Sequence, residues 1–278
     1  PVLVASWGEN WEEEFTAFER EPMASASIAQ TYAATLPDGS DVIVKVRRPG
    51  TAARLEADMR LLVRLAGATE RRSSDIARYR PVEFLQTFGK NLTREMDLAA
   101  EARACERIGG YLETLGAKTP VIHWHLTGLR VNVQERLPGI PASQIDRATD
   151  SEHNAVFARR YADAVLRMMI LNGEFHGDPH PGNVFRIAAD KVGFIDFGAI
   201  GFLSGARRQE IIRLIFGIAD EQTEDVADLL LHWADNPAVD RGQFAIDLGQ
   251  LIEEFRGTVL SGIEFSVIFD RVFGLLRE

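Results

Sequence analysis

The chain has 278 residues, 46% of them hydrophobic and 26% charged, which is typical of a globular protein long enough for two lobes with separate cores. Its 41 acidic residues outnumber 31 lysines and arginines, and the net charge of −10 argues against nucleic acid or an anionic membrane surface as the main partner, although local basic patches are compatible with it. Cys105 is the single cysteine, so an intramolecular disulfide is excluded and we expect a cytoplasmic protein in a reducing compartment.

Neither end of the sequence carries a membrane or export signal. No apolar run reaches the roughly 18 residues that a spanning helix needs, and the first residues lack the pattern of a signal peptide. The sequence begins at Pro1 without a methionine and ends at Glu278, which is compatible with a piece of a longer chain.

The first 46 residues predict a helix and then a β-hairpin. Trp11, Phe15 and Phe18 fall at helical spacing, which indicates a short amphipathic helix with a packing role. The runs 31–36 and 41–46 flank Pro37-Asp38-Gly39, and this pattern is typical of two antiparallel strands joined by a turn.

Lys45 lies inside the second of these strands, among apolar residues. An unpaired ammonium is costly to bury, so the lysine either meets an anion or lies exposed at a sheet edge. Upstream, the segment Ala24, Ser25, Ala26 and Ser27 has side chains small enough for a ligand to approach its backbone closely. Alanine cannot adopt positive φ cheaply, so this loop should be stiffer than a glycine-rich one.

Helical periodicity then continues to residue 115. We expect helices over 54–69, from Pro81 onward, and over 93–115. Glu101 falls on the apolar stripe of the last helix, and a carboxylate in that position needs a partner, for which Lys45 is the candidate. Glu95 and Asp97, a turn or more earlier, are also typical of an acidic helix N-terminus.

Residues 129–135 alternate like a strand and run into Leu137-Pro138-Gly139, which suits a hinge between lobes. Backbone groups of Glu135 and Leu137 could there hold the edge of an adenine. Farther along, apolar spacing predicts helices over 151–172, 207–219, 223–234, 241–255 and 264–276, so the C-terminal region should be almost wholly helical. The last of these has a broad apolar face, for which core packing is the default and membrane or partner docking the alternative.

The stretch from Phe175 to Phe185, followed by 192–198, gathers two carboxylates and one amide in a short segment rich in proline and glycine. Phosphoryl transfer needs this kind of set, because the reaction depends on positioning and on charge neutralisation by Mg²⁺ bound to oxygen ligands. Asp178 would face the nucleophile, and Asn183 and Asp196 would bind the metal. A structural turn, or a zinc site on His176, Asp178 and His180, is the alternative, but one cysteine and no further nearby histidine make a closed zinc site hard to complete.

These motifs also resemble those of known proteins. Asp178 and Asn183, followed by Asp196-Phe197-Gly198, match the order of the protein-kinase signature residues, with Gly177 where arginine is usual. More closely, the chain resembles the UbiB family of atypical protein-kinase-like proteins, also called aarF-domain kinases. The matching stretches are the alanine-rich segment 22–30, the strand containing Lys45, Glu95-Met96-Asp97, Glu101, 175–183 and 196–198.

The resemblance implies an α+β, bilobal protein-kinase-like fold, with an N-lobe over 1–136 that combines a small antiparallel sheet with added helices, and a mostly helical C-lobe over 137–278. It implies ATP and Mg²⁺ as cofactors, with the nucleotide bound by the alanine-rich loop, Lys45, Glu95, Asp97, Glu135 and Leu137, and the metal bound by Asn183 and Asp196. It also implies an atypical kinase or ATPase that supports ubiquinone or another isoprenoid-lipid pathway, with isoprenoid lipid or lipid-biosynthesis proteins as partners and peripheral contact with the inner membrane. The Lys-x-Gly-Gln motif of the family, whose lysine packs against the Glu-x-Asp acid, is absent from this sequence.

Two other functions remain open at this point. The sequence 176–183 also resembles the loop of small-molecule phosphotransferases of the aminoglycoside or choline type, although the alanine-rich and Glu-x-Asp motifs argue against that group. The other alternative is a lipid-binding scaffold in which nucleotide binding alters shape with little turnover.

Overall fold

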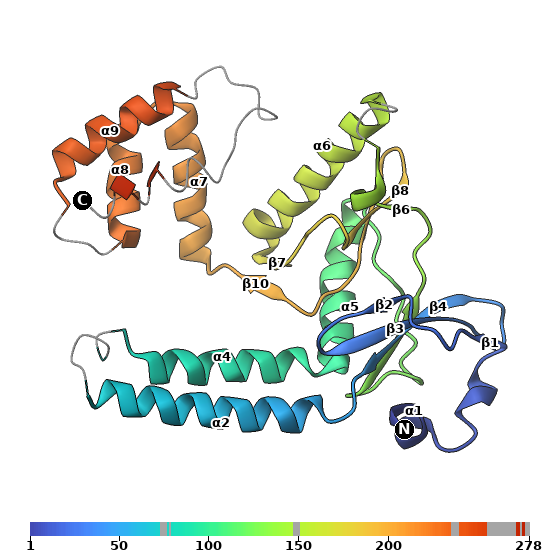
Figure 1. Ribbon diagram of the computed structural model, residues 1–278. Coiled ribbons are helices and arrows are strands. Elements are labelled where there is room, and N and C mark those ends of the chain that lie inside the picture. Colours follow the sequence, from blue (N-terminus) through green and yellow to red (C-terminus); the bar gives the residue numbers. More distant parts are fainter. Residues whose placement is uncertain are drawn as a thin grey trace. The chain divides into compact units, whose positions relative to one another are not determined.

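A computed structural model describes residues 1–72, 77, 79–146, 151–234, 239–254, 271–272 and 274–275. The chain divides into two compact units, which are described separately: the first contains residues 1–168 and 174–201, and the second contains 169–173 and 202–278 (Figure 1). The lobe boundary that the sequence predicts after Arg136 lies inside the first unit and stays a prediction.

An antiparallel sheet organises the beginning of the first unit. Its main strands are β3 (Ala29–Thr35), β4 (Asp41–Arg47) and β5 (Val131–Glu135), in the order β1-β3-β4-β5, with the short β1 (Ala17–Phe18) and β2 (Ala24–Ser25) both on β3. The predicted hairpin is confirmed, and its register pairs Thr31 with Lys45. Because side chains alternate across a sheet, Lys45 points to the face opposite the fully buried Val42 and Val44.

The predicted helix through Trp11 and Phe18 is wrong. The segment instead forms helix α1 (Val2–Trp7), a 3₁₀ turn η1 (Trp11–Glu14) and strand β1. Trp11 and Phe15 are buried with the sheet residues Val42 and Val44, and the rings of Trp11 and Phe18 meet edge to face at 5.0 Å. Pairing of β1 with β3 and this aromatic packing outweigh the helical spacing, which extends over only two turns.

Three helices follow β4: α2 (Thr51–Glu70), α4 (Pro81–Glu95) and α5 (Leu98–Thr114). Figure 1 shows α2 and α4 side by side. The prediction of a single helix over 93–115 is wrong, because α4 ends at Glu95 and α5 begins at Leu98. The Asp97 carboxylate accepts hydrogen bonds from the backbone N–H groups of Ala99 and Ala100, both at 3.0 Å. An N-cap of this kind starts a new helix and thereby sets the direction of α5.

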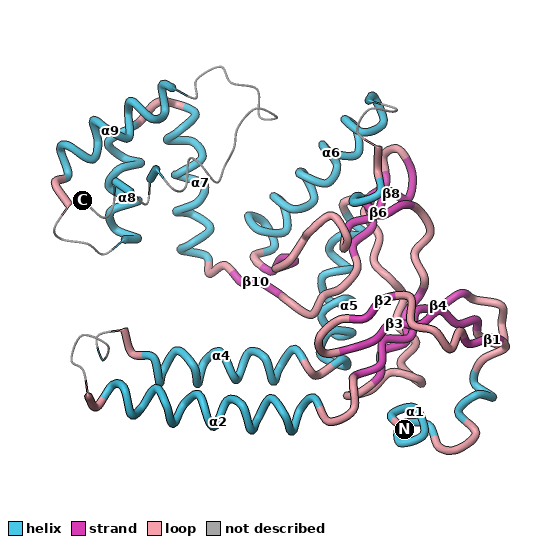
Figure 2. Tube along the Cα trace, in the orientation of Figure 1, coloured by secondary structure: helices cyan, strands magenta, loops and turns pink. Residues whose placement is uncertain are grey.

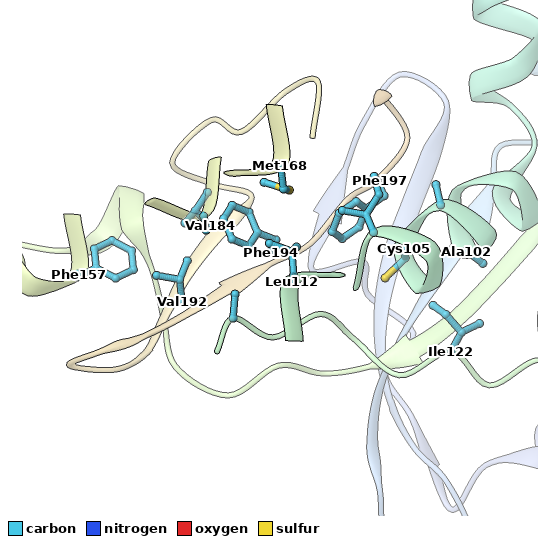
Figure 3. Close-up of a cluster of buried hydrophobic side chains, with 14 residues drawn as sticks. Ala102, Cys105, Leu112, Ile122, Phe157, Met168, Val184, Val192, Phe194 and Phe197 are labelled. Carbon is cyan, nitrogen blue, oxygen red and sulfur yellow. The ribbon is translucent and has the colours of Figure 1, made fainter. Parts of the chain in front are cut away.

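The rest of the first unit surrounds a second core. The elements of this part are β6 (Ile140–Pro141), the 3₁₀ turn η2 (Ala142–Gln144), α6 (Ser151–Arg167), β7 (Glu174–His176), β8 (Val184–Ala188), β9 (Lys191–Phe194) and β10 (Ile200–Phe202), whose last residue belongs to the second unit. Strands β6, β8 and β9 form one sheet, and β7 pairs with β10. Figure 3 shows the core, in which Phe194 and Phe197 lie between Met168 and the α5 residues Leu112 and Cys105.

In the second unit, the chain after β10 forms α7 (Gly205–Ala219), α8 (Thr223–Ala234) and α9 (Arg241–Glu254), so these three predicted helices are confirmed. Figure 2 shows them in cyan, and Leu214, Val226, Phe244 and Leu248 pack together between them. The predicted helix over 151–172 is also confirmed, with a π-helical last turn η3 (Met168–Asn172). Most of the helix predicted over 264–276 lies outside the described residues.

Candidate active site

One cavity in the first unit gathers residues that are far apart in the sequence. Its volume is about 360 Å³, and five of its polar residues come from β4, α5 and the two loops that flank β8 and β9: Lys45, Glu101, Asp178, Asn183 and Asp196. The remaining lining residues are Ala26, Ser27, Ile28, Ala29, Thr31, Leu98, Gly198 and Ala199. A hollow that combines one ammonium, three carboxylates and one amide is suited to an anionic ligand that carries a metal ion.

Lys45 lies between two carboxylates at the inner end of this cavity. Its Nζ donates to Oε1 of Glu101 and lies 3.4 Å from Oδ1 of Asp196, and Lys45 and Glu101 are 9% and 8% exposed. Burial opposes the positive charge, but the two carboxylates outweigh it and raise the pKa of Lys45 above its ordinary value. Lys45 is therefore a cation within reach of any phosphate in the cavity, and the predicted pairing with Glu101 is confirmed.

Asp196 takes an unusual backbone conformation, with φ of 64°, in the left-handed region that asparagine and aspartate enter more readily than most residues. This turn directs its carboxylate to Lys45. Burial alone would raise the pKa of Asp196, but the ammonium of Lys45 and hydrogen bonds from Lys45 and the Gly198 backbone hold it below its ordinary value. The group is thus ionised at neutral pH.

Asn183 lies across the loop from Asp196 with its amide oriented by the chain. Its Nδ2 donates to the carbonyl oxygen of Asp178 at 3.1 Å, and its backbone N–H donates to the carbonyl of His180 at 2.8 Å. The Ile195 backbone N–H donates to the Asn183 carbonyl at 2.9 Å, which ties the two loops together. Asn183 Oδ1 and the carboxylate of Asp196 are both hard oxygen donors of the kind that Mg²⁺ prefers.

The loop that carries Asp178 is held by a buried histidine. His176 Nδ1 accepts from the backbone N–H of Asp178 at 3.1 Å, so the neutral ring carries its proton on Nε2, which donates to the carbonyl of Ile195 at 2.8 Å. With both nitrogens engaged, His176 is not free to bind zinc, and the described residues contain no group of three metal-ligating side chains of the His, Cys, Asp and Glu type. The zinc alternative is therefore not supported.

Gly177 explains why the loop lacks the arginine that is usual before the aspartate. A Cβ at this position would lie 3.0 Å from the carbonyl oxygen of Ala199, and the Gly177 N–H already donates to that oxygen at 2.8 Å. The close approach of the two loops thus favours glycine.

The same loop is also held by α6, because the hydroxyl of Tyr161 donates to the carbonyl of Pro179 at 3.1 Å.

The alanine-rich segment is a short hairpin and not an open loop. Ala24 and Ser25 form β2 and do not line the cavity, whereas Ala26 and Ser27 lie in the turn and do. None of the four has positive φ, so this turn does not require glycine. Arg48 stiffens it further, because its Nε donates to the Ala26 carbonyl at 2.9 Å and its second guanidinium nitrogen donates to the Ser25 hydroxyl.

Three other predicted binding residues, Asp97, Glu135 and Leu137, are not among those that line the cavity. Asp97 is occupied as the cap of α5 and pairs with Arg103 at 3.2 Å, as expected from the alternative of an acidic helix start. The Glu135 backbone N–H donates to Val121 at 2.8 Å and its carboxylate pairs with Lys118, so only its carbonyl oxygen is left for an adenine. Leu137 is buried at 7% exposure, and the side chain of Glu95 lies outside the described part of the chain.

Sequence reasoning missed several lining residues, namely Ile28, Ala29, Thr31, Leu98 and Ala199. Thr31 could have been found from the hairpin, because the register that pairs it with Lys45 places both side chains on the same face. Leu98 is the first residue of α5, and the sequence pattern did not indicate the helix break that precedes it.

Comparison with known proteins identifies the family of the chain. The ABC1 atypical kinase-like domain matches residues 1–230. The chain belongs to this family. Its fold is α+β and protein-kinase-like, as the motifs indicated, and the suspected relationship to UbiB proteins is confirmed.

The "probable protein kinase UbiB" of Pseudomonas putida is 30% identical over 276 residues, which cover 96% of this chain and 51% of that protein. The protein of the same name from Marinobacter nauticus is 30% identical over 284 residues, covering 100% of this chain and 52% of its own length. The chain thus spans about half the length of the curated relatives it matches.

A solved structure is also similar, that of the complex of Rv3197 with erythromycin from Mycobacterium tuberculosis. It has a TM-score of 0.71 and 26% sequence identity, and the match covers 92% of this chain and 65% of that one.

Among the described residues, the helices are all too short or too polar to cross a membrane.

Proposed function

We propose that this member of the ABC1 atypical kinase-like family binds ATP with Mg²⁺ and transfers the terminal phosphoryl group to an acceptor or to water. In this proposal Lys45 contacts the phosphates, Glu101 holds Lys45, and Asn183 and Asp196 bind Mg²⁺. Asp178 accepts the proton of the attacking hydroxyl or orients the attacking water. The bound Mg²⁺ would neutralise charge on the phosphates, and the residues of the chain would supply position and orientation.

The observation that carries this proposal is the convergence of Lys45, Glu101, Asp178, Asn183 and Asp196 on one cavity of about 360 Å³. A buried lysine paired with two carboxylates serves no evident packing purpose, because an apolar residue of similar size would avoid the cost of desolvating the charges. The adjacent turn at Ala26 and Ser27 allows a phosphate to approach its backbone closely.

For the base of the nucleotide, we propose the end of β5, where the carbonyl of Glu135 and the N–H of Leu137 would meet the adenine edge. This assignment goes with a lobe boundary after residue 136. We further propose that the acceptor or regulated pathway involves ubiquinone or another isoprenoid lipid, with peripheral contact with the inner membrane, which the resemblance to UbiB proteins supports.

Calorimetric titration with ATP tests the nucleotide and metal assignments together. We expect binding in the presence of Mg²⁺, and weaker binding after chelation with EDTA. Asn183→Leu should lose most of the difference between the two conditions, because it removes one metal ligand. Asn183→Asp is the matched variant, since it keeps the oxygen donor and should retain the Mg²⁺ dependence.

Equal affinity with and without Mg²⁺ in the unmodified protein would contradict the metal site. Absence of ATP binding under both conditions would contradict the proposal as a whole. Release of phosphate without transfer to any acceptor would assign the activity to ATP hydrolysis rather than to a kinase.

A further inference from the structure

His180 lies beside Asp178 and has no part in the mechanism described so far. Its Nδ1 accepts a hydrogen bond from the backbone N–H of Gly182 at 3.0 Å. A ring nitrogen that accepts in this way carries no proton, so the neutral imidazole has its proton on Nε2. That nitrogen lies 4.0 Å from Oδ2 of Asp178.

The ring is held in this orientation by the chain around it. Pro179 and Pro181 on either side restrict the backbone, and a Cβ on Gly182 would lie 2.6 Å from Cε1 of the imidazole. A larger residue at position 182 would therefore displace the ring from this position. Within the loop, the two histidines differ: both ring nitrogens of His176 bond to the backbone, whereas in His180 only Nδ1 does so and Nε2 lies 4.0 Å from Oδ2 of Asp178.

We propose that His180 is a positioning residue for Asp178. When the site closes on its substrates, the Nε2–H donates to Oδ2 of Asp178, and Oδ1 is left to face the acceptor hydroxyl or water. The distance of 4.0 Å must shorten by about 1 Å to reach hydrogen-bond length, a change that catalytic contacts commonly undergo when substrate binds. This inference rests on the role of Asp178 in the proposed function.

The exposed carboxylate of Asp178 needs a hydrogen-bond donor such as His180 to fix its orientation. The side chain of Asp178 is 63% exposed, and its backbone N–H, not its carboxylate, is the group that His176 holds. Without a donor on Oδ2, the carboxylate can rotate about its side-chain bonds, and a misplacement of about 1 Å in a reacting group can cost roughly 100-fold in rate.

Two substitutions separate the functions of the two ring nitrogens. In His180→Asn the side-chain oxygen can still accept from Gly182, but the shorter amide leaves no N–H at the former position of Nε2. In His180→Gln the side-chain amide can place an N–H close to the former Nε2. We expect His180→Asn to lower kcat for ATP turnover by about 10- to 100-fold with little change in KM for ATP, and His180→Gln to recover part of that loss.

A double variant distinguishes positioning from a general effect on the loop. In the Asp178→Asn background, His180→Asn should lower kcat no further, because the group that it positions is already missing. A full additional loss in that background would overturn the inference. A rise in KM for ATP at unchanged kcat would overturn it as well, because His180 would then bind the nucleotide and not orient Asp178.

The tautomer can be measured without any activity. Two-bond ¹H–¹⁵N correlation spectra of the imidazoles in the purified protein should show an unprotonated Nδ1 and a protonated Nε2 for His180, assigned with His180→Asn. The opposite tautomer would contradict the inference while leaving nucleotide binding untouched. Failure of the unmodified protein to turn over ATP would contradict the proposed function and, with it, the role of His180.

Discussion

On the buried side of the site the ammonium of Lys45 is paired with the buried carboxylate of Glu101 and lies 3.4 Å from the half-exposed Asp196, whereas on the exposed side Asp178 and its neighbour His180 expose more than half of their side chains. The buried side is assembled without a ligand, because charges removed from water must be paired. The exposed side has no such constraint, and loop hydrogen bonds set its geometry.

This difference matches the two tasks of the proposed site. A phosphate clamp gains from rigidity, because contacts that are already in place need no reorganisation when the nucleotide binds. A base that receives an acceptor from solvent must remain accessible until that acceptor arrives. We therefore expect substitutions on the exposed side to affect turnover, and those on the buried side to affect stability and nucleotide affinity.

The largest expected effect comes from Asp178→Asn on the exposed side. Loss of the base should lower kcat by about 10²- to 10⁴-fold, because general base catalysis typically contributes that much. ATP affinity, measured by calorimetry, should stay near that of the unmodified protein. A variant with unchanged turnover would remove Asp178 from its assigned role.

Lys45→Met tests the buried side. It leaves Glu101 without its partner at 8% exposure, and loss of one member of a buried ion pair typically costs about 3–5 kcal/mol. We expect the free energy of unfolding, measured with urea, to fall by this order. The double variant Lys45→Met/Glu101→Leu should recover most of the stability but not ATP binding, and equal stability of the single and double variants would argue against the pair as a structural element.

Arg48→Ala should have a smaller effect, confined to the alanine-rich turn. It removes the hydrogen bonds to Ala26 and Ser25, which at about 1 kcal/mol each contribute about 2 kcal/mol to the order of the turn, and we expect part of this loss to appear as a roughly five-fold fall in ATP affinity. Arg54→Ala is the matched control, because Arg54 carries the same charge and lines the same hollow beside the turn, whereas within the described part of the chain the hydrogen bonds to Ala26 and Ser25 come from Arg48. An equal loss in both variants would indicate a general electrostatic effect instead of a stiffened turn.

The smallest effect concerns pH. Since Lys45 holds the pKa of Asp196 below its ordinary value of 3.8, their interaction contributes to stability above that value and is lost as pH falls through the lowered pKa of the folded state. Urea unfolding between about pH 6 and pH 3 should therefore show the advantage of the unmodified protein over Asp196→Asn shrinking toward acid. An advantage that stays constant over this range would contradict the interaction.

Much of the buried side could be predicted from the sequence, because a charged residue among apolar residues must be paired with an opposite charge. Lys45 in an apolar strand and Glu101 on an apolar helix stripe each needed a partner, and they pair with one another. The break at Met96 and Asp97 could not be predicted in the same way, because helical periodicity continues on both sides of it and a capping side chain competes with that pattern only weakly.

The exposed side illustrates the opposite case. The motif indicated the residue types at 178 and 183, but not the tautomer of His180, which depends on the Gly182 N–H, nor the positive φ of Asp196. The hydrogen bond from the Glu135 N–H to the Val121 carbonyl could not be predicted either, because the strand pattern does not specify which segment lies beside β5. Such features arise from contacts between loops and are not encoded in spacing.

The central claim is that the cavity binds a nucleotide together with Mg²⁺, and the melting temperature tests it most directly. It should be measured with ATP, ADP and Mg²⁺, separately and together, on the unmodified protein and on Asp196→Asn, because a ligand that binds only the folded state raises its stability. The account predicts a rise with nucleotide and Mg²⁺ together that is lost in Asp196→Asn. No rise in the unmodified protein, or an equal rise in both proteins, would contradict it.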